Sequence, residues 1–149
     1  MKNAKDESLH LFVVLTRASQ WVNAHADRHI RRLGLNRTEF GVLELLYHKG
    51  RQPLQQIGEK ILMTSGNITY VVDKLEKKEL VVRVGDPDDR RIWYAEITPR
   101  GVEFLERSFP EHADVIEQAV SGLSPEERRA AAELLKKLGR SAQESFKRK

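Results

Sequence analysis

Two short helix patterns followed by two strand patterns, all within residues 53–99, constrain the fold of this 149-residue chain more than any other feature. In the first pattern, Leu54, Ile57 and Ile61 recur at the spacing of one helical face. Gly58 interrupts this pattern. Because a glycine inside a helix costs roughly 1 kcal/mol relative to alanine, we expect a second helix to approach closely there. The pattern therefore predicts a pair of helices that share one core.

The second helix pattern follows after a short turn, and its apolar residues lie on one face at Ile68, Val71, Val72 and Leu75. Thr64 is suited to cap its N-terminus. The rest of its surface is mostly small and polar, and the side chains of interest there are Ser65, Gly66, Asn67, Thr69, Tyr70 and Lys74. Short polar side chains near a helix N-terminus can approach base edges and phosphates, which favours a DNA-recognition helix. The alternative is a polar face that contacts only solvent.

Residues 80–97 predict a β-hairpin. In its first half, Leu80, Val82 and Val84 alternate with Val81 and Arg83, and residues 92–97 are rich in β-forming side chains. The turn between them, GDPDDRR, has the composition of a tight hairpin loop. Two helices and a hairpin in this order predict a winged helix-turn-helix.

The hairpin turn carries Asp89, Arg90 and Arg91 at its tip. A carboxylate can hold a neighbouring guanidinium extended through two parallel hydrogen bonds, so that the positive charge is aimed. An aimed arginine can enter a narrow minor groove. We therefore assign these three residues, together with Arg83, to the predicted DNA-binding set; a solvated turn of ion pairs is the alternative.

Helical patterns flank this core on both sides, at residues 8–33 and 99–146. Asn36 and Glu39 have the spacing of a capping box that begins another helix, and residues 51–53 are a candidate short strand beside the wing. Thr98-Pro99 and Ser124-Pro125 are further helix starts, and Pro110 is expected to kink or break the helix between them.

The apolar surface of the flanking helices exceeds what one small core can cover. We therefore predict a mainly α fold with a small β-wing, in which one domain spans residues 1–149. Within it, a winged helix-turn-helix core at 36–98 is flanked by dimerisation helices at 8–33 and 99–146. A two-fold dimer of such a core matches a palindromic DNA site.

The composition excludes several classes of function. The chain has no cysteine, which rules out disulfides, thiolate nucleophiles and cysteine-type zinc sites. His25 and His29 have a spacing that can hold a metal, but no third ligand accompanies them, so we expect no metal and no cofactor. No catalytic motif is present, and we do not expect an enzyme. Without a signal peptide or a membrane-length apolar stretch, the expected location is the cytoplasm.

The sequence resembles the MarR family of bacterial transcription regulators over nearly its whole length. The most specific segments are LQQIGEKILMTSGNITYVVDKLEKK, the hairpin with GDPDDRR, ITPRG and EFGVLELLYHKG. The resemblance implies an obligate dimer that binds palindromic operator DNA, usually as a repressor. It also implies that a small aromatic or phenolic effector often lowers DNA affinity. The sequence departs from the family pattern at Glu79, where a helix-ending glycine is common.

The family's recognition positions correspond to Ser65, Gly66, Asn67, Thr69, Tyr70 and Lys74, and its wing pair to Asp89 with Arg90 or Arg91. The candidates for an effector pocket between the first two helices are Phe12, Trp21, Phe40 and Tyr47, and plain core packing is the alternative we favour for them. A winged-helix module that binds another protein rather than DNA is the second functional hypothesis. The Arg-bearing turn and the small polar helix face favour DNA.

Overall fold

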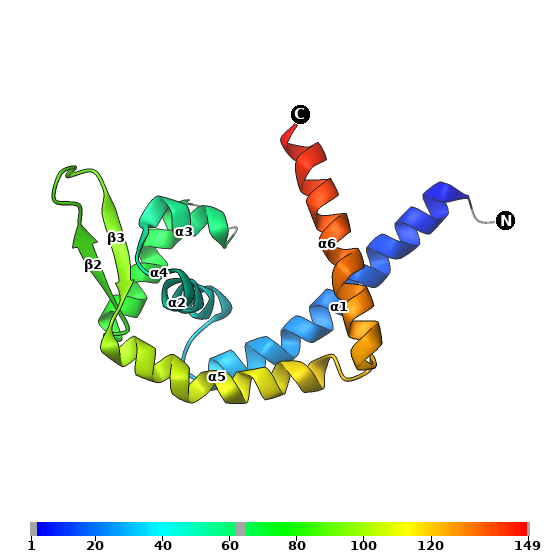
Figure 1. Cartoon of the computed structure of the whole chain (residues 1–149), viewed down its shortest axis with the longest axis horizontal. Coiled ribbons are helices and arrows are strands. Elements are labelled where there is room, and N and C mark those ends of the chain that lie inside the picture. The colour runs from blue at the N-terminus through cyan, green and yellow to red at the C-terminus, as the bar shows by residue number, and fades with distance from the viewer. Residues whose placement is uncertain (1–2, 62–64, 149) are drawn as a thin grey trace.

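The computed structural model describes residues 3–61 and 65–148, and its elements appear in the predicted order (Figure 1). They are α1 (Ala4–Arg32), α2 (Arg37–Lys49), β1 (Gln52–Pro53), α3 (Leu54–Lys60), α4 (Ser65–Lys77), β2 (Val81–Gly85), β3 (Trp93–Ile97), α5 (Pro99–Ala119) and α6 (Pro125–Lys147). The predicted fold class is thus confirmed. Figure 1 shows α2 to β3 gathered in one lobe, here called the winged lobe, from which α5 leads to the base of α6.

Most of the predicted helix starts are confirmed by their caps. The Asn36 side chain accepts from the Glu39 N–H at 2.8 Å, and the Thr98 hydroxyl accepts from the Gly101 N–H at 3.0 Å. The first helix begins at Ala4 rather than at residue 8, because Asn3 and Asp6 form a capping box that fixes its first turn. Thr64, predicted to cap α4, lies outside the described residues.

Pro110 was predicted to kink or break its helix, and it does not break it, since α5 is one continuous helix from Pro99 to Ala119. A proline removes one hydrogen bond from the helix ladder, but the neighbouring turns are held by packing. Leu105 and His112, on either side of it, are both buried. Tertiary contacts on both sides of the proline therefore keep the helix intact.

The three strands form an antiparallel sheet in the order β1-β3-β2, and β1 confirms the short strand predicted beside the wing. The predicted alternation is shifted by one residue: Val81 is 1% exposed, whereas Val82 is 40% exposed. The reason is that Leu80 belongs to the turn that ends α4, where its N–H donates to the Leu75 carbonyl at 3.0 Å. The strand and its two-residue period therefore begin at Val81.

One hydrophobic core fills the winged lobe, and its apolar side chains from α2, α3 and α4 include Leu43, Leu46, Ile57, Val72 and Leu75. Ile30 from α1 and Leu105 from α5 belong to the same core. Gly101 allows α5 to start against the end of α4, since a Cβ at that position would lie 2.3 Å from the Leu80 carbonyl oxygen. The flanking helices are therefore anchored in the core that carries the wing.

Within the described residues, most of α1 and all of α6 are left without buried residues. Only His29 and Ile30 are buried among the residues of α1, and α6 has no buried residue against the described part of this chain. The outer halves of α1 and α6 diverge in Figure 1. No helix within residues 3–61 and 65–148 combines the length and the apolar character that crossing a membrane would need.

Candidate DNA-binding surface

The outward face of α4 presents the predicted recognition residues. Asn67 and Thr69 are exposed, and Tyr70 is 61% exposed. The Lys74 ammonium lies over the Tyr70 ring, 4.8 Å from its centroid, so the two side chains form a cation–π pair. Ser65 and Gly66 belong to the first turn of α4, and their side chains lie outside what the structure describes. Asn67, Thr69 and Tyr70 are therefore accessible to a ligand on this face.

At the wing tip, Asp89 holds Arg91 rather than Arg90. The Arg91 Nε donates to Asp89 Oδ1 at 3.1 Å, and its Nη2 donates to Asp89 Oδ2 at 3.2 Å. The Arg91 backbone N–H donates to the same carboxylate at 2.9 Å. These bonds also lower the pKa of the Asp89 carboxyl, because they stabilise its charged form. The Arg91 side chain is nevertheless 90% exposed, which leaves its guanidinium available to a ligand.

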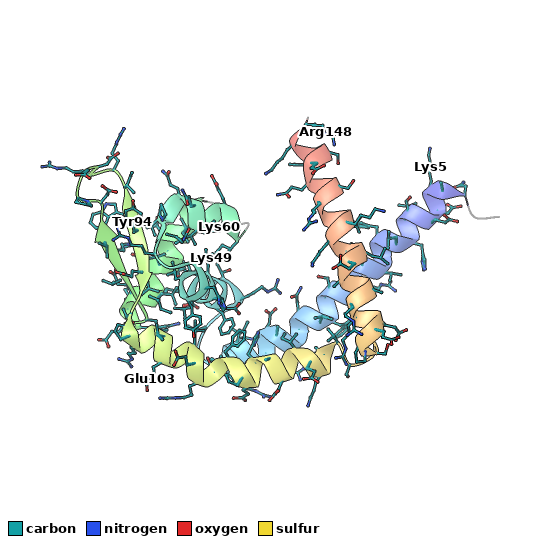
Figure 2. The ribbon with its side chains drawn as sticks, viewed as in Figure 1. Lys5, Lys49, Lys60, Tyr94, Glu103 and Arg148 are labelled. Atoms are coloured by element: carbon teal, nitrogen blue, oxygen red, sulfur yellow. The ribbon has the colours of Figure 1, made fainter. Side chains whose placement is uncertain are left out.

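The Asp86 carboxylate holds the turn together by accepting three hydrogen bonds. The sequence did not predict this role. Its Oδ1 accepts from the backbone N–H groups of Asp88 at 2.8 Å and Asp89 at 3.0 Å, and its Oδ2 accepts from the Tyr94 hydroxyl at 2.9 Å. The N–H of Asp88 contributes most to the lowered pKa of Asp86. Figure 2 labels Tyr94 on the hairpin. The Asp-Pro-Asp-Asp order was a visible sign of such a turn.

A second cation was also missed near the wing. The Arg51 guanidinium lies 4.7 Å from the centroid of the Tyr94 ring and is held there by a cation–π contact. A hollow of about 570 Å³ lies between α3, α4 and the tip of the wing. Its lining includes Gln55, Gln56, Thr69, Arg91 and Trp93. Polar side chains from three elements therefore face one space between the recognition helix and the wing tip.

Arg83 is the predicted DNA-binding residue whose surroundings differ most from those of a free surface cation. Its guanidinium forms ion pairs with Asp73 and Glu76 of α4, and it also donates to the Thr69 carbonyl at 3.1 Å. The side chain is 24% exposed. Arg83 therefore lies between the wing and α4, with its donors already directed at the helix.

The four effector-pocket candidates are not brought together within the chain. Phe40 is buried in the core, as the packing alternative predicted, whereas Phe12 and Trp21 on α1 are both about two-thirds exposed, at 64% and 66%. Tyr47 lines a different cavity of about 240 Å³, together with Glu44, His48, Leu105, Glu106, Phe109 and Pro110. That cavity lies between α2 and α5, and only Tyr47 of the predicted set belongs to it.

The predicted histidine pair also separates. His25 is exposed, whereas His29 is buried, and its Nδ1 lies 3.0 Å from the Nδ1 of His112 on α5. The His29 Nε2 lies 3.7 Å from Glu111 Oε1. Across residues 3–61 and 65–148, no three side chains of the metal-binding types are grouped closely enough to hold a metal ion. His29 is therefore a core residue that links α1 to α5.

Known proteins that are similar to this chain are DNA-binding transcription regulators. The model of the MarR family matches residues 35–93. The HTH-type transcriptional regulator MhqR of Bacillus subtilis (strain 168) is 55% identical over 139 residues, which cover 93% of this chain and 96% of that protein. The members of this family and this relative are transcription regulators rather than enzymes.

Solved structures agree with this similarity. Sco3205, a MarR family transcriptional regulator from Streptomyces coelicolor solved in complex with DNA, superposes with a TM-score of 0.83 at 25% identity, covering 95% of this chain and 94% of that one. BpsR of Bordetella bronchiseptica, whose DNA binding is regulated by 6-hydroxynicotinic acid, gives a TM-score of 0.80 at 27% identity, covering 87% and 98%. This chain therefore belongs to the MarR family of winged-helix transcription regulators.

Proposed function

We propose that this protein is a homodimeric repressor that binds a palindromic operator and is released by a small aromatic effector. The observation that carries the proposal is the pairing of two DNA-reading features on one lobe. These are the exposed polar face of α4 and the wing tip, where Asp89 aims Arg91. In this proposal α4 enters the major groove, Arg91 reaches the adjacent minor groove, and Arg51 and Arg90 contact phosphates.

The uncovered apolar residues of α1 and α6 support the dimer. Leu9, Phe12 and Trp21 on α1 and Leu134 and Leu135 on α6 are all exposed in the single chain. Large apolar side chains exposed along two helices in this way are typical of an interface. A two-fold axis through these helices would set two copies of α4 about 34 to 36 Å apart, which is one turn of DNA.

The cavity between α2 and α5 supports an aromatic effector. Its lining includes the rings of Tyr47, His48 and Phe109, and its volume of about 240 Å³ suits a single substituted ring. The Glu44 carboxyl lies at its edge, where burial raises its pKa and where its oxygens can accept a hydrogen bond from a ligand hydroxyl. A ligand wedged here would change the angle between α2 in the winged lobe and α5, which leads to the dimerisation helices.

Selection of bound fragments from the source genome tests the DNA-binding part. We expect the fragments to share one palindrome, and transcription from a promoter carrying it to fall when the protein is present. Failure to enrich any common sequence would favour the winged-helix protein-interaction module instead.

Titration of the DNA complex with substituted phenols tests the effector part. We expect at least one phenol to release the operator from the wild type, and Tyr47→Ala to weaken that response without weakening operator binding. His25→Ala, which removes an exposed ring outside the cavity, is the matched control. An equal loss of response in both variants would argue against the α2–α5 cavity.

A further inference from the structure

Arg83 connects the two DNA-reading elements of the winged lobe. It lies on β2 of the wing, opposite Ala95 of β3, on the sheet face directed at the core. From there its guanidinium meets three successive positions on one face of α4: the Thr69 carbonyl, Asp73 and Glu76. The first and the last of these positions are seven residues apart, or about 10.5 Å along the helix. One side chain therefore fastens two turns of the recognition helix to the wing.

The contacts are directional rather than diffuse. The Arg83 Nη2 donates to the Thr69 carbonyl at 3.1 Å and is ion-paired with Asp73, and its Nη1 lies 3.6 Å from Glu76 Oε1. The Arg83 backbone N–H also donates to Glu76 Oε2 at 3.3 Å, so Glu76 contacts both the main chain and the side chain of this residue. The planar guanidinium has donors fixed in a fork, which suits it to several acceptors at once.

From this geometry we infer that Arg83 is a positioning residue, which sets the spacing between the recognition helix and the wing tip instead of contacting DNA. The inference rests on the proposed DNA-binding function and deepens it. Thr69 and Tyr70 at one end of the connection and the Asp89–Arg91 pair at the other must enter two different grooves at the same time. If the distance and orientation between α4 and the hairpin are fixed in the free protein, both elements are preorganised for DNA binding.

Arg83 also neutralises negative charge on the recognition helix. Asp73 and Glu76 are both partly exposed on the recognition helix, where free carboxylates would repel phosphates. The Arg83 guanidinium neutralises them in place. If Arg83 instead turned outward to contact a phosphate, it would leave two carboxylates unpaired beside the DNA.

Asp73→Asn separates the positioning role from a phosphate contact by the sign of its effect. It removes a negative charge, so it should tighten DNA binding if Arg83 is then free to reach a phosphate. If Arg83 is a positioning residue, the same change loosens the connection and weakens binding to the selected operator by about three- to tenfold. Asp88→Asn at the wing tip removes the same charge away from Arg83, and we expect it not to weaken binding.

Arg83→Lys supplies an independent measurement. A lysine keeps the charge and can serve a phosphate, but a single ammonium group cannot reach the Thr69 carbonyl, Asp73 and Glu76 together. We expect Arg83→Lys to weaken operator binding about as much as Asp73→Asn, to leave random-sequence DNA binding and the salt slope unchanged, and to add nothing in the double variant. Wild-type affinity in Arg83→Lys, or tighter binding by Asp73→Asn, would overturn the positioning role.

Hydrogen exchange in the DNA-free protein keeps this test separate from the proposed function. We expect the amides of residues 81–85 to exchange at least about threefold faster in Asp73→Asn and Arg83→Lys than in the wild type or Asp88→Asn. If the wild type binds no DNA, the proposed function fails, and the exchange rates still decide whether Arg83 fastens the wing to α4. Unchanged exchange in both variants would show that it does not.

Discussion

Apolar side chains are buried in the winged lobe but exposed on the end helices α1 and α6. Leu43 in the winged lobe is 0% exposed, whereas Leu134 on α6 is 67% exposed. The residue type is identical, so the difference lies in what this chain provides to cover it. The winged lobe fills its core mainly from its own helices and strands, and Ile30 of α1 and Leu105 of α5 complete it. The end helices carry an apolar face for which the described part of the chain supplies no cover.

This difference suggests that folding and assembly are divided between the two regions. Substitutions in the winged lobe should change the stability of the fold or the contact with DNA. Substitutions on α1 or α6 should change association between copies. The predictions below test that division, beginning with the largest expected effect.

The largest effect is expected for Leu134→Lys on α6. If Leu134 is buried in a two-fold interface, the change acts twice in each dimer. Since a buried leucine contributes about 2 kcal/mol, dimerisation should weaken by at least about a hundredfold. Sedimentation should then detect a monomer that retains its helical circular dichroism, and operator affinity should fall in parallel.

Leu134→Met is the matched control, because it conserves volume and apolar character and should remain a dimer. Full operator affinity in a proven Leu134→Lys monomer would break the link between the end helices and DNA binding. Loss of the fold, rather than of the dimer, would show that α6 supports the winged lobe directly.

The next effect concerns the wing tip and should leave assembly untouched. Arg91→Ala should weaken operator binding by about 1 to 3 kcal/mol through loss of a groove or phosphate contact. Asp89→Ala should weaken it less, although it removes a negative charge, because it releases the aimed guanidinium. Binding titrations with Asp88→Ala as a charge-matched control measure this. Tighter binding by Asp89→Ala than by the wild type would contradict the aiming role.

A smaller effect is expected where the two regions meet, at the buried pair of His29 and His112. Burial, and next the charge of His29, lower the pKa of His112, so the folded protein favours the neutral ring. Below a pH of about 6.5 the unfolded chain binds this proton while the folded chain resists it. The free energy of unfolding should therefore decrease on acidification, by at most about 1.4 kcal/mol per pH unit for one proton.

Urea denaturation across this pH range measures the effect. His112→Asn keeps a hydrogen-bonding group beside His29 but does not titrate, so its stability should depend less on pH. Glu111, whose Oε1 lies 3.7 Å from the His29 Nε2, is present in both proteins. His25→Asn on the exposed part of α1 should behave as the wild type does. Equal pH dependence in His112→Asn and the wild type would exclude the pair as its source.

The division between regions also describes what the sequence could predict. The winged lobe was predictable because its signals are local: the Asn36–Glu39 capping box, the apolar stripe of α4 and the Asp-rich turn each act over a few residues. The contacts of Arg83 could not be predicted, because they join β2 to α4 through side-chain geometry that the spacing of residues in the sequence does not specify. The His29–His112 pair joins residues 83 positions apart, and no sequence pattern marks it.

The smallest predicted effect is a change in stability on substitution of Glu79, the residue that departs from the family pattern. Its φ of 64° is left-handed, and it ends α4 with the Glu79 N–H donating to the Glu76 carbonyl at 2.9 Å. The turn that usually takes glycine is therefore kept without one. A side chain in this conformation costs roughly 1 kcal/mol, and the exposed ion pair with Arg100 offsets little of that cost.

Glu79→Gly should accordingly stabilise the winged lobe by about 0.5 to 1 kcal/mol, because glycine adopts this backbone conformation without strain. Glu79→Ala removes the same ion pair but keeps a Cβ in the left-handed region, so it should bring no gain. Comparing the two variants by urea denaturation separates backbone strain from the lost charge pair. If alanine stabilised the protein as much as glycine, the ion pair and its desolvation, not the backbone, would be the source of the cost. Sedimentation should show an unchanged dimer in both variants, because Glu79 lies at the end of the recognition helix and not on the uncovered face of α1 or α6.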